Sequence, residues 1–254
     1  MPIAQVVEAM RDQPWGVTEE QGRLLYDFVL KHQPERILEL GAGIGTSACY
    51  MASALSELGS GKITSIDINP DLPEWIDRTF AKVSPDARKH HELIISATSY
   101  NDELMWMIEA QMKDGLCHPI YDFIFIDGAH TWEIDACAFF LAEKLLMPGC
   151  WMLFDDLNWT LAGSPEAQKN MGLKRPPDRL QETPQVTKIF DLLVAQHPNF
   201  ENLTKHGEWG WAQKRSVAKS ASNPITDLYR PSVAHRIRRV TDKLWRNWKR
   251  VRRG

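Results

Sequence analysis

RILELGAGIGTSACYMASALSEL, residues 36–58, is the stretch that decides the fold of this 254-residue chain. Its apolar start, RILEL, predicts a buried strand, the glycines of GAGIG predict a tight turn, and the remainder predicts a helix. KITSIDI, at residues 62–68, predicts the next strand. A strand, a helix and a second strand of these lengths form a right-handed βαβ unit, so the two strands are expected to be parallel.

The same alternation continues along the chain. One of the helices that follow is expected to stop at Gly115, and another is expected to span residues 132–146. Strands that alternate with helices build a doubly wound, mostly parallel sheet that is covered on both faces, so the fold class is α/β and Rossmann-like. The further strands of this sheet are predicted at HELIIS (91–96), DFIFID (122–127) and CWMLFD (150–155).

Elements of other kinds flank this α/β region. Residues 1–35 predict a helical cap, in which Thr18 and Gln21 form a capping-box pattern at a helix start. Near the other end, FENLTK and GWAQK are joined around His206-Gly207. They predict an antiparallel hairpin at the edge of the sheet.

The chain divides into a domain at 1–215, with a lid or substrate loop at 157–184, a linker at 216–231 and a basic segment at 232–254. The basic segment holds nine Lys/Arg and a single acid, although the whole chain has a net charge of −3. Its apolar residues recur at three- and four-residue spacing, which predicts a cationic amphipathic helix. Such a helix can lie on an anionic membrane surface, or it can pack on the acidic remainder of the chain or across a homo-oligomer. Nucleic acid is not favoured, because no aromatic and basic RNA-binding module accompanies the segment.

The composition is that of an ordinary globular protein, with 43% hydrophobic and 25% charged residues. No run of about 18 apolar residues predicts a membrane span, and the N-terminus does not have the pattern of a secretory signal. The four cysteines lack CxxC spacing, which favours reduced, buried thiols over a structural zinc site. The expected location is cytoplasmic, with peripheral association at the inner face of the membrane if the basic segment binds there.

The glycine turn predicts a ligand without matching the dinucleotide fingerprint. Glycines at this point let the backbone approach a ligand, and they leave the first N–H groups of the helix free to bind it. The fingerprint GxGxxG requires glycine where this chain has Thr46. Asp67 ends the next strand, where a carboxylate can accept hydrogen bonds from ribose hydroxyls. These features favour a nucleoside-type ligand; the alternative is a tight turn that binds nothing.

Five segments in order carry a resemblance to a known family: ELGAGIGTS, SIDINP, SATS, FIDGAH and FDD. They resemble the class I S-adenosylmethionine-dependent methyltransferases. More narrowly, they are similar to the metal-dependent O-methyltransferases of the catechol and caffeoyl-CoA type, and especially to those of the macrolide-sugar type. The resemblance spans about residues 17–214 and implies a seven-stranded sheet whose last strand is antiparallel.

The resemblance also implies which residues bind S-adenosylmethionine. Gly41, Gly43 and Ser47 would hold the methionine end, Asp67 would bind the ribose, and Thr98 would lie against the adenine. The residue before this threonine is alanine, whereas many members of the class have an acid there. The full set of expected cofactor-binding residues is Glu39, Gly41, Gly43, Ser47, Asp67, Thr98 and Asp127.

Two of the predicted strands end in acids. Asp127 follows FIFI, and Asp155 and Asp156 follow WMLF. In an open parallel sheet, ligands bind at the carboxyl ends of the strands, so these acids are expected to converge. Carboxylates that converge repel each other unless a cation compensates them, and oxygen ligands suit Mg²⁺ or a similar divalent cation. The resemblance implies the same metal site. The alternative is that the acids of FDD cap a turn or a helix.

His130 follows the first of these acids by three residues and is the candidate general base. The catechol-type enzymes carry lysine at the corresponding position and the sugar-modifying enzymes carry histidine, so this chain resembles the latter. A neutral imidazole can take the proton of a hydroxyl group as its oxygen attacks the methyl carbon. Trp132 and Trp159 flank the two acidic segments, where they could stack on a sugar ring, although packing is the simpler role for them.

The sequence therefore predicts a metal-dependent O-methyltransferase that uses S-adenosylmethionine. The expected acceptor is a hydroxyl of a sugar, as a glycoside or in a cell-surface polysaccharide. The first alternative is a catechol-like or other small phenolic acceptor. An alternative of another class is a non-catalytic scaffold that binds S-adenosylmethionine and uses the basic segment to dock partners.

Overall fold

The computed structural model describes residues 2–13, 15–170 and 176–216, all within one compact unit, Met1–Lys219. The predicted basic helix at 232–254, and all but the first residue of the predicted linker at 216–231, lie outside the described residues. Among the helices that are described, none is long and apolar enough to cross a membrane.

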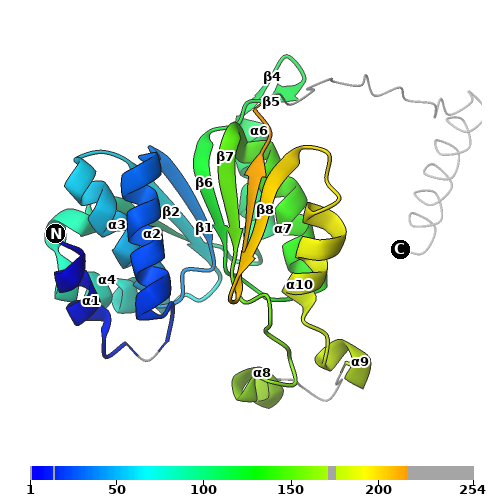
Figure 1. The fold of residues 1–254 in the computed structure, drawn as a ribbon, viewed down its shortest axis with the longest axis horizontal. Helices are drawn as coiled ribbons and strands as arrows, with labels where there is room; N and C mark the ends of the chain where they lie inside the picture. Colours follow the sequence, from blue (N-terminus) through cyan, green and yellow to red (C-terminus); the bar gives the residue numbers. More distant parts are fainter. Residues whose placement is uncertain (1, 14, 171–175, 217–254) are drawn as a thin grey trace, which may run out of the picture. The chain divides into compact units, whose positions relative to one another are not determined.

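A seven-stranded sheet forms the centre of the molecule, with the strand order β3-β2-β1-β6-β7-β9-β8 (Figure 1). The neighbours from β3 to β7 are parallel, whereas β9 is antiparallel to both β7 and β8. This arrangement confirms the predicted fold class, the antiparallel last strand and the hairpin at the sheet edge. The strands are β1 (Arg36–Leu40), β2 (Lys62–Asp67), β3 (His91–Ile95), β6 (Tyr121–Ile126), β7 (Leu146–Phe154), β8 (Phe200–His206) and β9 (Trp209–Lys214).

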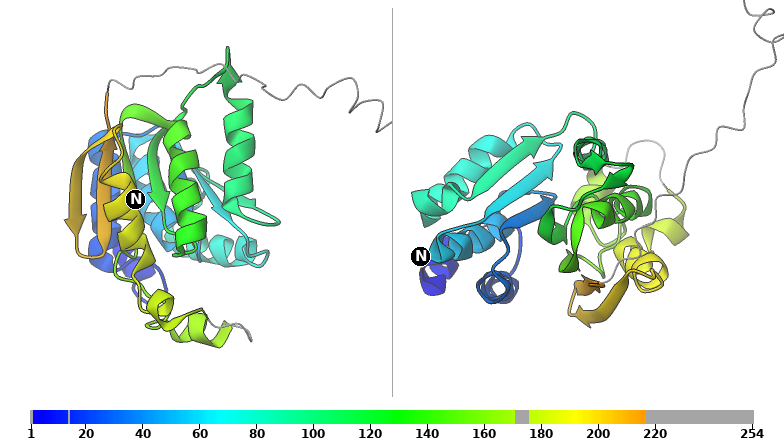
Figure 2. Two further views of the ribbon diagram at one scale, coloured as in Figure 1. Left: turned by 90° about the vertical axis from the view of Figure 1, so that its right-hand side faces the viewer. Right: turned by 90° about the horizontal axis from the view of Figure 1, so that it is seen from above.

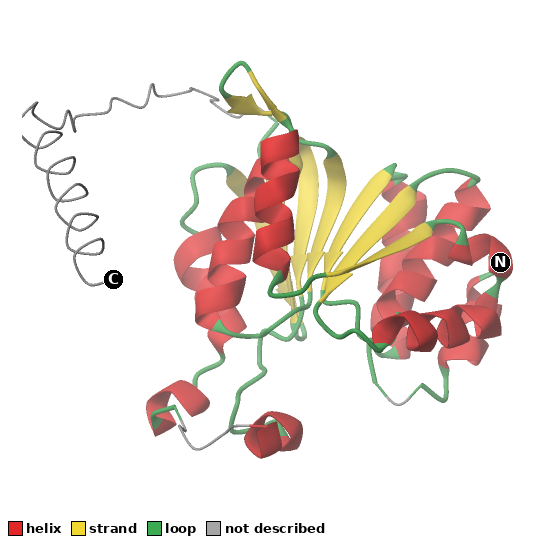
Figure 3. Ribbon diagram, turned by 180° about the vertical axis from the view of Figure 1, so that it is seen from behind, coloured by secondary structure: helices red, strands yellow, loops and turns green. Residues whose placement is uncertain are grey.

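Helices cover the sheet on both faces, as Figures 2 and 3 show from other sides. One layer consists of α1 (Ile3–Met10), α2 (Glu19–His32), α3 (Thr46–Leu58), α4 (Leu72–Val83) and α5 (Pro85–Arg88). The other consists of α6 (Tyr100–Ala110), α7 (Trp132–Leu145) and α10 (Gln185–Ile189), which continues as the π-helical segment η1 (Phe190–Val194). Two short helices, α8 (Pro165–Asn170) and α9 (Asp178–Gln181), lie in the segment predicted as a lid.

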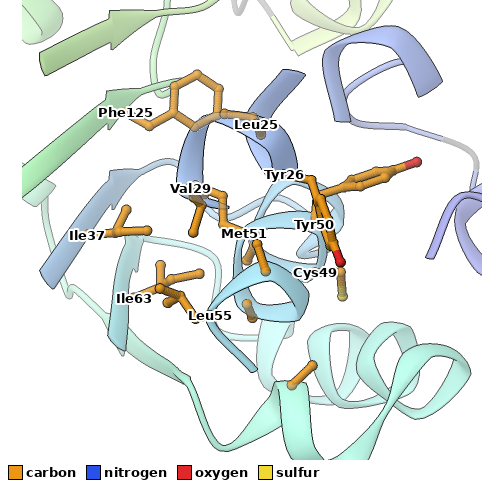
Figure 4. Close-up of a cluster of buried hydrophobic side chains, with 14 of the residues drawn as sticks. Leu25, Tyr26, Val29, Ile37, Cys49, Tyr50, Met51, Leu55, Ile63 and Phe125 are labelled. Carbon is orange, nitrogen blue, oxygen red and sulfur yellow. The ribbon is translucent and has the colours of Figure 1, made fainter. Parts of the chain in front are cut away.

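Each face of the sheet has its own hydrophobic core because successive side chains of a strand point to opposite faces. In β1, Ile37 packs with α2 and α3, as Figure 4 shows, whereas Leu38 packs with the helices of the other layer. Both side chains are fully buried. Burial of one such side chain contributes about 1.5–3 kcal/mol to stability, so the two cores hold the helices on both faces of the sheet.

The N-terminal cap forms as predicted. Gln21 N donates to Thr18 Oγ1 at 3.3 Å, and Thr18 N donates to Gln21 Oε1 at 2.8 Å, which completes the capping box at the start of α2. These two bonds satisfy backbone and side-chain groups at a helix start that would otherwise face water alone.

The prediction that the helix after β3 stops at Gly115 is wrong. Helix α6 ends at Ala110, and a small hairpin of β4 (Met112–Lys113) and β5 (Leu116–Cys117) follows. Asp114 and Gly115 form the turn of this hairpin with φ angles of 53° and 79°. Asp-Gly is a favoured pair for two-residue hairpin turns with positive φ, so here it closes a hairpin rather than ending a helix.

Strand β7 begins earlier than predicted, at Leu146 instead of Cys150. It therefore contains Pro148 and Gly149, which would normally argue against a strand interior. The pairing of β6 with β7 shifts register between Tyr121 and Phe123, opposite these residues. The irregularity is a bulge that accommodates the proline and glycine before the regular part of the strand.

The strand ends that carry the acids lie side by side, as the sequence predicts. Asp127 N donates to Leu40 O at 2.8 Å, and Asp155 N donates to Ile126 O at 3.0 Å. The parallel ladder thus continues one residue beyond the ends of β1, β6 and β7. These bonds fix the first residue of each acidic segment to its neighbouring strand.

Gly41 permits the closest of these backbone contacts, and its replacement is a test of the fold. Its φ angle is 91°, and a Cβ atom would lie 1.8 Å from the carbonyl oxygen of Asp127. We expect Gly41→Ala to lower the free energy of unfolding by about 3 kcal/mol or more, from overpacking and left-handed strain together. Gly43→Ala is the matched control, because its φ is 47° and a Cβ there would meet nothing within 4 Å. It should lose only about 1 kcal/mol. Urea unfolding of both variants measures the difference, and equal losses would contradict this account.

Candidate active site

A cavity of about 500 Å³ opens at the carboxyl ends of the parallel strands. Its volume lies in the range of small-molecule and cofactor sites. The walls come from the loop before α2, the glycine turn, the end of β2, the start of α6 and the two acidic strand ends. The sequence-predicted residues that line it are Gly41, Gly43, Ser47, Asp67, Thr98, Asp127, His130, Asp155 and Asp156.

The glycine turn and the end of β2 form one wall, and Asp67 holds them together. Asp67 Oδ2 accepts hydrogen bonds from Ala42 N at 2.9 Å and from Gly43 N at 3.4 Å. Its other carboxylate oxygen accepts from Ile68 N and Asn69 N. Gly43 has open space where a Cβ atom would point. The turn is therefore a cradle with an open face toward the cavity, which fits a nucleoside-type cofactor.

Glu39 lies beneath this cradle and does not line the cavity itself. It is fully buried, and it accepts hydrogen bonds from Ser47 Oγ and Ser65 Oγ, each at 2.5 Å. Burial raises the pKa of Glu39 to about 8, although the two serine hydroxyls favour its charged form. Its connection to the cavity runs through Ser47, which is part of the wall.

Thr98 lies at the far end of the same wall, just before α6. Its hydroxyl donates to the Asp102 carboxylate. Ser99 is the N-cap of α6 and accepts from Asn101 N at 3.2 Å. The segment is thus held in place by its own capping bonds, with Thr98 facing the cavity.

The acids at the strand ends form a cluster in the adjoining wall. One side-chain ligand atom each of Asp127, His130 and Asp156 lies within 4.8 Å of the others. His130 Nε2 lies 3.4 Å from Asp127 Oδ1 and 3.1 Å from Asp156 Oδ2. Asp155 is turned aside, because its Oδ1 accepts from Trp209 Nε1 and from Asp156 N, both at 2.7 Å. His130 therefore occupies the third place in the three-residue group, where the sequence predicted Asp155.

Positive charge is scarce around this cluster. None of the described residues that line the cavity is lysine or arginine. Burial raises the pKa of Asp155 to about 8, and the charges of Asp127 and Asp156 add to that effect. Burial also raises the pKa of Asp127. A set of carboxylate oxygens that lacks a fixed counter-charge has the chemistry of a site for a hard divalent cation, so the residues present fit Mg²⁺.

His130 is the nearest group that can compensate the acids. Burial by itself lowers its pKa, but Asp127 and Asp156 outweigh burial and raise the pKa to about 9. Its backbone has a left-handed φ of 56°. The ring lies 5.1 Å from that of Trp159, at an interplanar angle of 41°. Trp132 does not line the cavity; its backbone N–H donates to Gln185 Oε1 at 2.7 Å.

Several wall residues were not predicted from the sequence. Trp15 and Gly16 come from the loop before α2, where the Thr46 hydroxyl donates to Trp15 O at 3.1 Å. Tyr100 begins α6, and Glu208 lies in the β8–β9 turn. The only feature of the sequence that could have pointed to these residues is that each lies near the end of a predicted helix or strand. The contacts that bring them to the cavity join segments far apart in the chain.

Glu39 makes stability depend on pH. Its folded-state pKa of about 8 lies above the ordinary value of 4.5. Between these values the unfolded chain has released the proton that the folded protein keeps, so the free energy of unfolding falls as pH rises. Glu39→Gln has no proton to lose. We therefore expect the variant to gain a few kcal/mol relative to the unsubstituted protein between about pH 5 and pH 8. Urea unfolding at both pH values tests this, and a stability difference that is independent of pH would contradict it.

Comparison with known proteins agrees with this geometry. A family model described as a methyltransferase domain matches residues 38–157, from β1 to the segment after β7. No curated protein sequence matches the chain.

Solved structures share the fold at low sequence identity. The O-methyltransferase TomG from Streptomyces achromogenes, in complex with SAM, is 21% identical, with 84% of this chain and 89% of that chain covered and a TM-score of 0.55. An O-methyltransferase from Bacillus cereus in complex with SAH gives the same identity, coverage and TM-score. A putative caffeoyl-CoA O-methyltransferase from Staphylococcus aureus is 17% identical, with 84% and 92% covered and a TM-score of 0.59.

These findings confirm the resemblance at the level of a methyltransferase domain and its fold. The matched residues contain the glycine turn, Asp67 and both acidic strand ends. Residues 38–157 therefore match a methyltransferase domain, and the chain shares its fold with solved O-methyltransferase structures in complex with SAM and SAH.

Proposed function

We propose that the protein transfers the methyl group of S-adenosylmethionine to a hydroxyl oxygen, with a divalent cation at the acidic cluster and His130 as general base. One observation carries the proposal. The glycine turn and the cluster of Asp127, His130 and Asp156 form adjoining walls of the same cavity. A cofactor on the first wall and a hydroxyl at the second would therefore share one space.

On the cofactor side, each predicted residue has a proposed role. The backbone N–H groups at the start of α3, including that of Ser47, bind the methionine carboxylate, as helix N-termini bind anions. Gly41 and Gly43 allow this close approach. Asp67 accepts from the ribose hydroxyls, and Thr98 contacts the adenine. When bound, S-adenosylmethionine supplies an electrophilic methyl group on a sulfonium.

On the acceptor side, Asp127 and Asp156 would hold the cation directly, and Asp155, which accepts a hydrogen bond from Trp209 Nε1, would support them. When bound, a divalent cation lowers the pKa of a coordinated hydroxyl and orients it. His130 then takes the hydroxyl proton. It can do so only in its neutral form, and compensation of Asp127 and Asp156 by positive charge favours that form.

A sugar hydroxyl is the proposed acceptor. An alcohol is a weak acid and needs a positioned base, and His130 supplies one where the catechol-type enzymes carry lysine. Trp159, whose ring lies beside His130, offers an aromatic face to a sugar ring. The second candidate is a catechol-like phenol, which is favoured by the similarity to the putative caffeoyl-CoA enzyme. A scaffold that binds the cofactor without turnover is the alternative of another class.

Thermal unfolding with S-adenosylhomocysteine and Mg²⁺ tests both ligand sites. A ligand that binds only the folded state adds about 2.7 kcal/mol of stability at a hundredfold excess over its Kd. We expect each ligand to raise the Tm, and EDTA to reverse the effect of Mg²⁺. Asp127→Asn should lose the Mg²⁺ shift and keep most of the nucleoside shift. If Mg²⁺ has no effect on the unsubstituted protein, the acidic cluster does not bind it.

Methyl transfer to simple methyl glycosides and to a catechol separates the acceptor classes. We expect His130→Ala to lower turnover of a glycoside by about 10²- to 10⁴-fold, the usual contribution of a general base. The loss should be far smaller for the catechol, because a phenol is more acidic than an alcohol. His118→Ala, at an exposed histidine of the β5 hairpin, is the matched control and should leave both rates unchanged. A glycoside rate that survives His130→Ala would rule out this base.

A further inference from the structure

We propose that Tyr100 and Asp135 are positioning residues that hold the turn carrying His130. The inference rests on the proposed function, in which His130 takes the proton of the acceptor. The turn, residues 127–131, joins β6 to α7. Neither Tyr100 nor Asp135 belongs to the acidic cluster that faces the cation.

His130 needs external support because its backbone is in the left-handed region, with a φ of 56°. That conformation costs a residue with a side chain about 1–2 kcal/mol. A strained residue at an active site persists when its surroundings fix it, so the contacts of the neighbouring peptide groups decide where the imidazole lies.

The contacts of the turn are made with one buried pair of side chains, Tyr100 and Asp135. Tyr100 OH accepts a hydrogen bond from Ala129 N at 3.2 Å and donates one to Asp135 Oδ1. The backbone N–H groups of Ala129 and His130 also lie against the Asp135 carboxylate and favour its charged form. Tyr100 is 5% exposed and Asp135 is 1% exposed. The N–H of Ala129 is therefore linked through the Tyr100 hydroxyl to a carboxylate that is shielded from water.

Packing against Tyr100 also holds the same turn. A Cβ atom on Gly128 would lie 2.6 Å from the Tyr100 ring, so the ring rests directly against the backbone of the turn. Asp135 N donates to Thr131 O at 2.9 Å. Asp135 thus closes the first turn of α7 with its backbone and binds the preceding turn with its side chain.

The Tyr100 hydroxyl and the Asp135 carboxylate are not needed for packing in the hydrophobic core, because apolar side chains would pack there as well. The Tyr100 ring packs in the hydrophobic cluster with α6 and α7, where phenylalanine would serve equally well. A buried carboxylate without lysine or arginine costs stability, and burial raises the pKa of Asp135. The partners that offset this cost are the Tyr100 hydroxyl, the two N–H groups and the charge of His130. The arrangement is therefore specific to the geometry of the turn.

Amide hydrogen exchange tests the pair without an acceptor. In Tyr100→Phe, Ala129 N–H loses its hydroxyl partner, so its exchange should be up to about tenfold faster, which corresponds to one hydrogen bond. The ring resonances of His130 in NMR spectra should shift as well, while the affinity for S-adenosylhomocysteine stays within about twofold. Tyr121→Phe is the matched control, since this buried tyrosine packs in the same cluster and contacts Met107 Sδ. Unchanged exchange of Ala129 and an unchanged His130 signal would overturn the proposal.

A double-mutant cycle on methyl transfer to the glycoside and catechol probes separates a positioning role from a general structural one. Tyr100→Phe should lower kcat for the glycoside about tenfold or more and kcat for the catechol far less, with little change in the KM for S-adenosylmethionine. In the His130→Ala background it should cause no further loss, because it acts through His130. An equal loss in both backgrounds would overturn the proposal. If Tyr100→Phe does not fold, Asp135→Asn takes its place, since its amide oxygen can still accept one N–H.

The experiments give a different result if the proposed function itself is wrong. If His130→Ala keeps full turnover, His130 is not the base and the proposed mechanism fails. The amide hydrogen-exchange rates of Ala129 and His130 still decide whether Tyr100 and Asp135 hold the turn.

Discussion

Two backbone hydrogen bonds, from Asp127 to Leu40 and from Asp155 to Ile126, set the constraint on which the site depends. They extend the parallel ladder past the ends of the strands, so the acidic segments cannot move apart without breaking the sheet. The repulsion between their carboxylates must therefore be relieved by other means. His130 compensates them in part, and a bound cation would do so more fully.

Three acidic side chains, which differ in how deeply they are buried, stabilise the cavity wall in different ways. Glu39, fully buried beneath the glycine turn, is bound by two serine hydroxyls and keeps a proton more readily than usual. Asp135 is bound by Tyr100 and by the backbone of the turn that carries His130. Asp67 is more exposed and binds four backbone N–H groups. Each carboxyl group ties an element end to its neighbour, so the loops that line the cavity are held by acidic side chains on a rigid sheet.

Much of the fold was predictable because its signals are local. Apolar runs that end at glycines indicated where the strands lie, and the capping-box pair Thr18 and Gln21 indicated the start of α2. The wrong predictions concern sequence patterns that are compatible with two different local structures. Asp114-Gly115 closes a hairpin instead of ending a helix, and Pro148-Gly149 lies within a bulged strand instead of before it. In both cases a partner strand decided the outcome.

By itself the sequence determined the alternation of strands and helices, the glycine turn, and the placing of Asp127 and Asp155 at neighbouring strand ends. These follow from periodicity and from the rule that parallel strands end at one edge. Only the tertiary structure decided which way the side chains of the cluster turn. Trp209, 54 residues away along the chain, draws Asp155 aside, and His130 takes its place beside Asp156. Such contacts join segments that no local pattern connects, because the energy that selects them arises from burial and pairing in the folded chain.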